Sequence, residues 1–213
     1  MEGYEPLITG LAIFFAAHLF AGFPGPRQRL ISAMGRNVYR ALFSLVSLAG
    51  FVLIVYGVAI CPVDVLWTPP LWTQYVPLVI MPFAFLLVVG AYMSHDVKRY
   101  TRHPMLWGIV LWAAGHLVAN GDLGGVLLFA SFLAYALVGQ LLADRKMRLT
   151  DPDGWADLDA GTSAIPFAAM AAGKPFEARG DLGVKVIAIA VVVFVAVLLT
   201  HAQIIGVQAH YLL

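Results

Sequence analysis

The stretch that decides the fold is Thr101–Asp122, TRHPMLWGIVLWAAGHLVANGD, in which a basic entry and a proline lead into an apolar run that carries a histidine. A helical run of roughly 17 to 25 apolar residues crosses a hydrocarbon core of about 30 Å. A histidine inside such a span needs a hydrogen bond, a water-lined cavity or a metal, because its ring nitrogens are costly to bury without a partner. The role of this histidine, His116, is therefore the main question about function.

The composition of the whole chain is that of a polytopic membrane protein. Of its 213 residues 61% are hydrophobic and 12% are charged, with a mean hydropathy of +0.85. A soluble domain is much less apolar than this. We therefore predict an all-α protein with six transmembrane helices. The predicted spans are residues 6–24, 38–60, 74–93, 104–120, 122–142 and 183–204.

The charged residues alternate between the connections of these helices. All 13 Lys and Arg residues lie in three patches, at 27–40, 98–102 and 145–185, and the other connections carry acidic residues only. By the positive-inside rule the three patches are cytoplasmic and both termini are outside. The sequence thus predicts one transmembrane domain over residues 1–213, with a cytoplasmic connection at about 143–182.

Several classes of site are excluded by what the sequence lacks. One cysteine, Cys61, excludes an internal disulfide framework and cysteine-rich zinc or iron–sulfur sites. The basic patches follow the topology, so we expect no nucleic-acid partner. The expected partner is the lipid bilayer.

Two histidines lie inside the predicted spans. His18 is in the first span, about 9 Å before Pro24 at about 1.5 Å of rise per residue. His116 is in the fourth span and shares one helical stripe with Trp112 and Asn120. Both histidines are candidate metal ligands, and Trp112 and Asn120 are candidates to shape the pocket around the second.

Two glycines suggest what His116 could bind. Gly108 and Gly115 lie about 80 to 100 degrees round the helix from it, where a planar macrocycle could approach the backbone. This pattern suggests a b-type haem held by axial histidines, since the CxxCH attachment motif is absent. The alternative is that His116 donates to a backbone carbonyl and that the glycines permit close helix packing. The spacing alone favours this alternative.

The basic entry to the fourth span is the remaining candidate site. Pro104 suits the first position of a helix, because its missing N–H would be unsatisfied there anyway. Arg102 and His103 are then placed to bind haem propionates or a lipid headgroup near the cytoplasmic face. The alternative is a solvated interfacial cluster. His201 and His210, near the other face, are interpreted as interfacial.

Four blocks of the sequence carry a resemblance to a known family: His18 with Arg27 and Arg29, residues 35–45, residues 102–122, and residues 144–146. They resemble the bacterial NnrU proteins. The resemblance implies a place in the bacterial inner membrane and a link to denitrification or nitric-oxide metabolism.

The same blocks, extended by residues 162–168, resemble the 15-cis-zeta-carotene isomerases of plants and cyanobacteria. In that family the histidines that match His18 and His116 are the proposed ligands of a haem b. A cysteine one turn before the second histidine is proposed to alternate with it as a ligand, and Ala113 stands at that position here. The resemblance therefore implies a bis-histidine haem and argues against the isomerase mechanism.

The sequence leaves other functions open, and it assigns no catalytic residue. One alternative is a non-catalytic membrane subunit of a larger respiratory or photosynthetic complex, with membrane protein partners. Another is a haem-dependent carotenoid-type isomerase. A third is an S-adenosylmethionine-dependent methyltransferase, because the Arg-His-Pro entry at residues 102–104 resembles that of isoprenylcysteine carboxyl methyltransferases.

Overall fold

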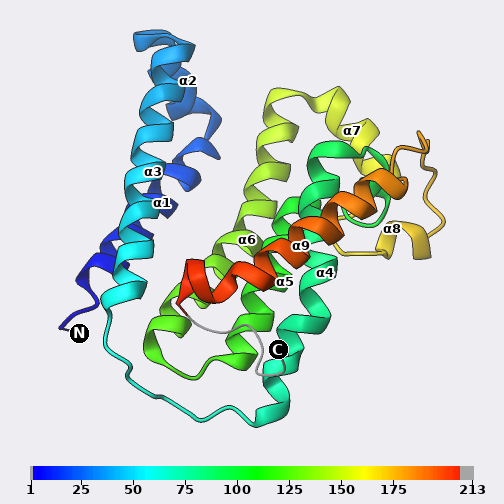
Figure 1. Ribbon diagram of the computed structural model, residues 1–213. Helices are drawn as coiled ribbons and strands as arrows, with labels where there is room; N and C mark the ends of the chain where they lie inside the picture. Colours follow the sequence, from blue (N-terminus) through cyan, green and yellow to red (C-terminus); the bar gives the residue numbers. More distant parts are fainter. Residues whose placement is uncertain (1, 207–213) are drawn as a thin grey trace. The chain divides into compact units, whose positions relative to one another are not determined.

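The computed structural model describes residues 2–206, which are helical apart from turns, loops and an isolated antiparallel bridge between Val65 and Asp122. Figure 1 shows this arrangement of helices along the chain. The helices are α1 (Glu5–Ala21), α2 (Pro24–Met34), α3 (Arg36–Ile60), η1 (Leu71–Gln74), α4 (Tyr75–Met93), η2 (Asp96–Arg99), α5 (Pro104–Ala119), α6 (Leu123–Thr150), α7 (Pro152–Gly161), α8 (Ala168–Ala171) and α9 (Val184–Ile205). His210 lies outside the described residues.

The all-α prediction is confirmed, and several helices have the character of membrane spans. Among the described residues, four helical segments are long and apolar enough to cross a membrane: α3, η1 with α4, α6 and most of α9. The bent pair of α1 and α2 would make a fifth, whereas α5 is shorter, with 16 residues. Six spans with both termini outside therefore remain a prediction.

The first predicted span, residues 6–24, ends three residues early at Ala21, and a bend of 90° separates α1 from α2. Phe23 is extended, with φ −96° and ψ 106°, because the ring of the following proline disfavours the helical region. Pro24 then begins α2, where its missing N–H costs nothing. The basic segment that follows His18, which sequence analysis treated as a connection, is therefore a helix.

The helix α6 is longer than the predicted span at 122–142. Asp122 caps its first turn by accepting a hydrogen bond of 2.7 Å from the N–H of Gly125. The helix ends at Thr150, one residue before an Asp-Pro pair. The connection predicted to begin at residue 143 thus begins about eight residues later, because no glycine or proline interrupts 143–150.

The chain folds into two compact units, each built from two separate segments. Unit 1 comprises Met1–Thr68 and Gly121–Asp151, and unit 2 comprises Pro69–Asn120 and Pro152–Leu213. In unit 1, α1 packs along α3 and also contacts α6, whereas in unit 2 α4 packs against α5 and α9.

Glycines allow α1 and α3 to approach each other closely. A Cβ atom added to Gly10 would lie 2.6 Å from the backbone N of Ile54, and one on Gly57 would lie 2.3 Å from the backbone N of Leu7. Leu7 and Ile54 belong to the buried core of unit 1, together with Tyr4. Small residues permit this kind of backbone contact between apolar helices. The sequence alone does not predict this glycine-lined interface, because Gly10 and Gly57 lie far apart along the chain.

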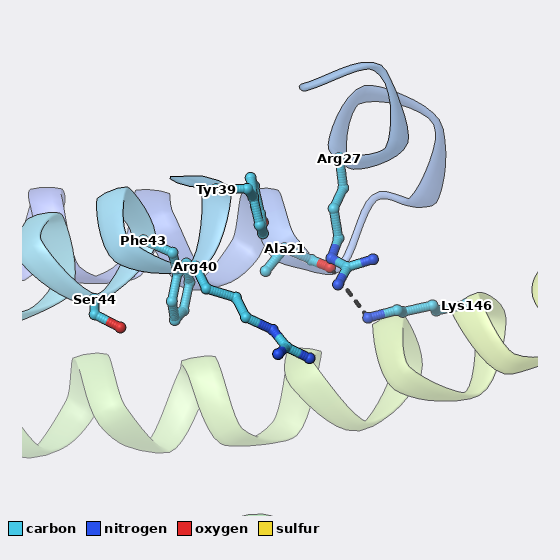
Figure 2. A pocket seen from close by; sticks show the side chains of 7 residues that line it. All are labelled: Ala21, Arg27, Tyr39, Arg40, Phe43, Ser44 and Lys146. Carbon is cyan, nitrogen blue, oxygen red and sulfur yellow. Dashed lines mark hydrogen bonds between the residues drawn. The ribbon is translucent and has the colours of Figure 1, made fainter. Parts of the chain in front are cut away.

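The two ends of unit 1 carry opposite charges. At one end the hydroxyl of Tyr4 donates to Asp64 at 3.0 Å, and burial is the main cause that raises the pKa of Tyr4. At the other end Arg27, Arg40 and Lys146 line one pocket (Figure 2). Residues from two of the basic patches thus line one pocket.

Candidate functional site

His116 lies in the last turn of α5, in unit 2, and its ring is held by its own helix. Nδ1 is 2.7 Å from the backbone carbonyl of Trp112, and the two rings are tilted, with centroids 5.7 Å apart. The side chain of Asn120 donates to the carbonyl of His116 at 2.7 Å. Asn120 therefore ends the helix beside the histidine and contacts its main chain.

His18 lies in the last turn of α1, in unit 1, and repeats this arrangement. Nδ1 is 2.7 Å from the carbonyl of Phe14, four residues earlier. The imidazole stacks on the ring of Phe14 at 4.1 Å and meets the edges of Phe43 and Tyr135 at 5.2 and 5.9 Å. Half-buried aromatic rings therefore fix the orientation of this histidine.

The Nδ1 contacts decide the tautomer of both rings. A carbonyl oxygen only accepts, so Nδ1 must carry the proton in each case and Nε2 carries the lone pair. Histidines that ligate metals almost always hold their second ring nitrogen in this way, often through a backbone carbonyl. His18 and His116, described each within its own unit, thus have the tautomer that ligation through Nε2 requires.

The glycine face of α5 is a helix-packing surface, as the alternative interpretation predicted. A Cβ at Gly108 would lie 2.6 Å from Val88 and 2.9 Å from the carbonyl of Ala84, both in α4. Gly115 faces Pro77 of the same helix at 3.7 Å. The helix α4 therefore fills the groove in which we expected a macrocycle, because close packing buries more apolar surface there.

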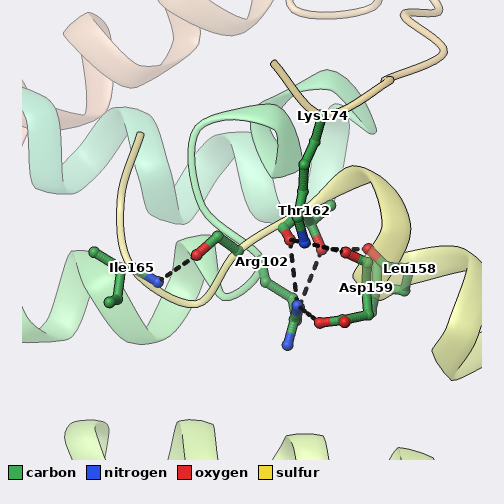
Figure 3. Close-up of polar contacts among 7 residues, drawn as sticks. Arg102, Leu158, Asp159, Thr162, Ile165 and Lys174 are labelled. Atoms are coloured by element: carbon green, nitrogen blue, oxygen red, sulfur yellow. Dashed lines mark hydrogen bonds and ion pairs between the residues drawn. The ribbon is translucent and has the colours of Figure 1, made fainter. Parts of the chain in front are cut away.

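The buried Arg102 holds the connection after α6 against the start of α5 (Figure 3). Its side chain is 5% exposed and forms an ion pair with Asp159. Nε also donates to Oγ1 of Thr162 at 3.0 Å, and the guanidinium lies 4.4 Å from the ring centre of Trp155. The contacts of Arg102 here are with the chain itself, and its binding of propionates or lipid stays a prediction.

Residues next to Arg102 make further contacts with the connection after α6. The indole N–H of Trp107 donates to the carbonyl of Ala164 at 2.8 Å, and the hydroxyl of Thr101 contacts the same carbonyl at 3.3 Å. His103 precedes α5, and its carbonyl accepts the first hydrogen bond from Trp107. Sequence analysis missed these partners, because each lies about 60 residues away along the chain.

A second polar cluster joins the segment before α5 to the segment before α9. Asp181 accepts hydrogen bonds from the backbone N–H of Asp96 and His95 and from the hydroxyl of Ser94, at 2.7 to 3.0 Å. These donors, the Asp96 N–H first, lower the pKa of Asp181 to about 2. Asp96 in turn accepts from the N–H of Arg179 at 2.7 Å, which lowers its pKa as well.

The lowered pKa values of Asp96 and Asp181 imply that the folded protein loses stability in acid. A carboxyl group with a lowered pKa in the folded state stabilises it above the unfolded pKa, near 4, and this contribution is lost as the pH falls towards 2. We expect the unfolding temperature of detergent-purified protein to fall over this range. Asp181→Asn should lower the unfolding temperature at neutral pH and make it depend less on pH in the acid range. Asp157→Asn, at an exposed position, is the control, and parallel pH profiles for all three proteins would contradict the assignment.

In the described part of the chain, the side chains supply no site for a metal ion held by the protein alone. Within residues 2–206 no group of three or more His, Cys, Asp or Glu side chains is placed to hold a metal ion. Haem differs, since the macrocycle brings its own equatorial ligands and needs only axial ones from the protein. Two histidines with the Nδ1–H tautomer fit that requirement.

Taken together, these features define a helical membrane protein with histidines fixed inside apolar helices. The chain belongs to the NnrU family, whose model, described as NnrU protein, matches residues 6–209. It is also similar to the chloroplastic 15-cis-zeta-carotene isomerase of Zea mays, with 25% identity over 197 residues. That match covers 81% of this chain and 52% of the maize protein, so the chain spans about half the length of its relative. No solved structure matches.

Proposed function

We propose that the protein binds haem b with His18 and His116 as axial ligands. We further propose that it acts in the bacterial inner membrane, in denitrification or nitric-oxide metabolism. Membership of the NnrU family supports this setting. The haem proposal rests on one observation, the hydrogen bond of 2.7 Å from Nδ1 of each histidine to the carbonyl four residues earlier.

The surrounding residues would keep each imidazole ready to ligate. The carbonyls of Phe14 and Trp112 fix the tautomer and restrict rotation of the rings, and a hydrogen-bonded imidazole is a more basic ligand. Asn120 holds the end of α5 in place one turn after His116. Bound haem would supply an iron with redox or Lewis-acid chemistry, and these residues would bind and orient it.

The absorption spectrum of the purified protein tests the proposal. Protein prepared in detergent from haem-sufficient cells should show a Soret band and, after dithionite, a sharp α band. His18→Ala and His116→Ala should each lose most of this absorbance at equal protein concentration. His95→Ala is the matched control, because this half-buried histidine lies outside the apolar helices and its Nδ1 is 3.6 Å from a carboxylate oxygen of Asp96 instead of on a backbone carbonyl.

A rescue experiment separates ligation from folding. In His116→Gly, added imidazole should restore the Soret band if the lost side chain was a ligand, since the small molecule replaces only the ligating ring. A colourless, monodisperse wild-type protein would contradict the haem proposal. It would favour the alternative function, a non-catalytic membrane subunit of a larger complex. Bands that survive both alanine substitutions would show that other residues hold the haem.

Haem-dependent isomerisation of a carotenoid is the second candidate function. The similarity to the maize 15-cis-zeta-carotene isomerase favours it. Against it, Ala113 is fully buried at the position where the resemblance places a second ligand, and alanine has no ligating atom. We therefore rank it below haem binding in nitrogen-oxide metabolism.

A further inference from the structure

A pocket in unit 1 contains neither of the two proposed haem ligands, although Phe43 in its wall also contacts the ring of His18. It is a cavity of about 380 Å³ beside the bend between α1 and α2 (Figure 2). Helices α3 and α6 complete its wall, so three segments of unit 1 that are distant in sequence meet here. The lining residues are Ala21, Arg27, Tyr39, Arg40, Phe43, Ser44 and Lys146.

The pocket is strongly cationic. Arg27, Arg40 and Lys146 bring three positive charges to it, and none of the lining residues is acidic. Lys146 donates to the carbonyl of Ala21 at 3.3 Å, and the guanidinium of Arg27 lies 5.4 Å from the ring centre of Tyr39. In the described part of the chain neither arginine forms an ion pair with a carboxylate. Like charges gathered in this way repel each other, and a bound anion would relieve the repulsion.

A buried hydroxyl group points independently to a ligand. Tyr39 is 8% exposed, and its hydroxyl has no hydrogen-bond partner within the described residues. Buried polar groups are nearly always hydrogen-bonded, so an exception beside a cavity needs an explanation. A ligand oxygen in the pocket would accept from this hydroxyl and pair with the cations at once.

The surface beside the pocket indicates which class of molecule bears the anionic group. Arg40 and Ser44 are exposed on α3, and their stripe of the helix continues at i+4 and i+7 spacing into the apolar residues Leu48, Phe51 and Val55, which are 57%, 50% and 52% exposed. A free anion would need only the cations, whereas an apolar surface that continues from the pocket suits acyl chains. Basic pockets at the ends of apolar helices recognise lipid headgroups in this way.

We propose that this pocket binds the phosphate of an anionic phospholipid, whose acyl chains lie along the exposed apolar face of α3. Arg27, Arg40 and Lys146 pair with the phosphate oxygens, and Tyr39 donates to one of them. The proposal does not depend on haem.

Lipid binding to the full-length protein tests it. Native mass spectrometry in detergent should show phosphatidylglycerol bound at least tenfold more tightly than phosphatidylcholine. The double substitution Arg27→Gln with Arg40→Gln should abolish this preference. Arg29→Gln with Arg36→Gln is the matched control, because it removes two exposed charges of the same patch that do not line the pocket. An equal loss in both double variants would overturn the proposal in favour of general surface charge.

Tyr39→Phe separates a ligand contact from a structural role. It should weaken phosphatidylglycerol binding about threefold to tenfold, yet leave the unfolding temperature without lipid unchanged or raised, because it removes an unpartnered buried hydroxyl. Unchanged lipid affinity would contradict the proposed contact.

Two further experiments distinguish a phospholipid from other sources of the anionic group. If millimolar inorganic phosphate displaces the lipid and stabilises the protein equally, the site binds a free anion and the lipid assignment fails. If the Arg27 and Arg40 double variant keeps its lipid preference but loses a Soret band present in the wild type, the pocket serves haem propionates instead.

Discussion

Gly57→Ala should destabilise the protein by about 3 kcal/mol, or prevent its recovery in folded form. The added Cβ would lie 2.3 Å from the backbone N of Leu7 and 2.5 Å from its Cα. These are main-chain atoms of α1, so no side-chain rotation relieves the overlap and the two helices must separate. Separation would expose Leu7, which is fully buried, and disturb its contacts with Ile54.

Thermal unfolding and size-exclusion elution in detergent measure this effect. Gly25→Ala is the matched control, because no atom beyond its chain neighbours and its own helix backbone lies within 4 Å of the position of its added Cβ. We expect Gly25→Ala to change the unfolding temperature little, because the restriction that Pro26 places on the preceding residue offsets the higher helix propensity of alanine. Wild-type stability in Gly57→Ala would contradict the close approach of α1 and α3.

Arg102→Ala should release the connection after α6 from the start of α5, at a cost of about 2 to 3 kcal/mol. The substitution leaves Asp159 and Thr162 without their buried partner and uncovers one face of Trp155. The side chain of Asp159 is 50% exposed, so water can hydrogen-bond to its carboxylate once Arg102 is removed. The expected loss of folding free energy is therefore smaller than for a fully buried ion pair. Arg102→Lys should rescue little, because an ammonium cannot reproduce the guanidinium fork or its stacking.

Hydrogen exchange along residues 152–171 measures the release directly. Arg102→Ala should speed exchange and proteolytic cleavage in this segment, while α3 and α6 keep their protection. Arg99→Ala, which removes an exposed charge from the same basic patch, should change neither. Equal protection in wild type and Arg102→Ala would mean that other contacts hold the connection.

The sequence predicted those parts of the site that a single helix determines. His18 and His116 lie in apolar helices as expected, and each finds its hydrogen bond four residues back, at a distance fixed by helical geometry. Asn120 likewise acts within its own turn. The sequence could not predict the role of Gly108, because a glycine-lined helix face can pack against either a cofactor or another helix. Only the position of α4 shows which of the two packs there.

The apolar composition, the basic patches and the periodic runs by themselves determined that this is an all-helical protein with membrane-span character, because local propensity and hydropathy act over a few turns. Only the tertiary structure decided which residues meet. Lys146 reaches the carbonyl of Ala21 across 125 residues, and Arg102 reaches Thr162 across 60. Such contacts depend on how helices pack, and packing depends on the shapes of all their faces together, which no local pattern encodes.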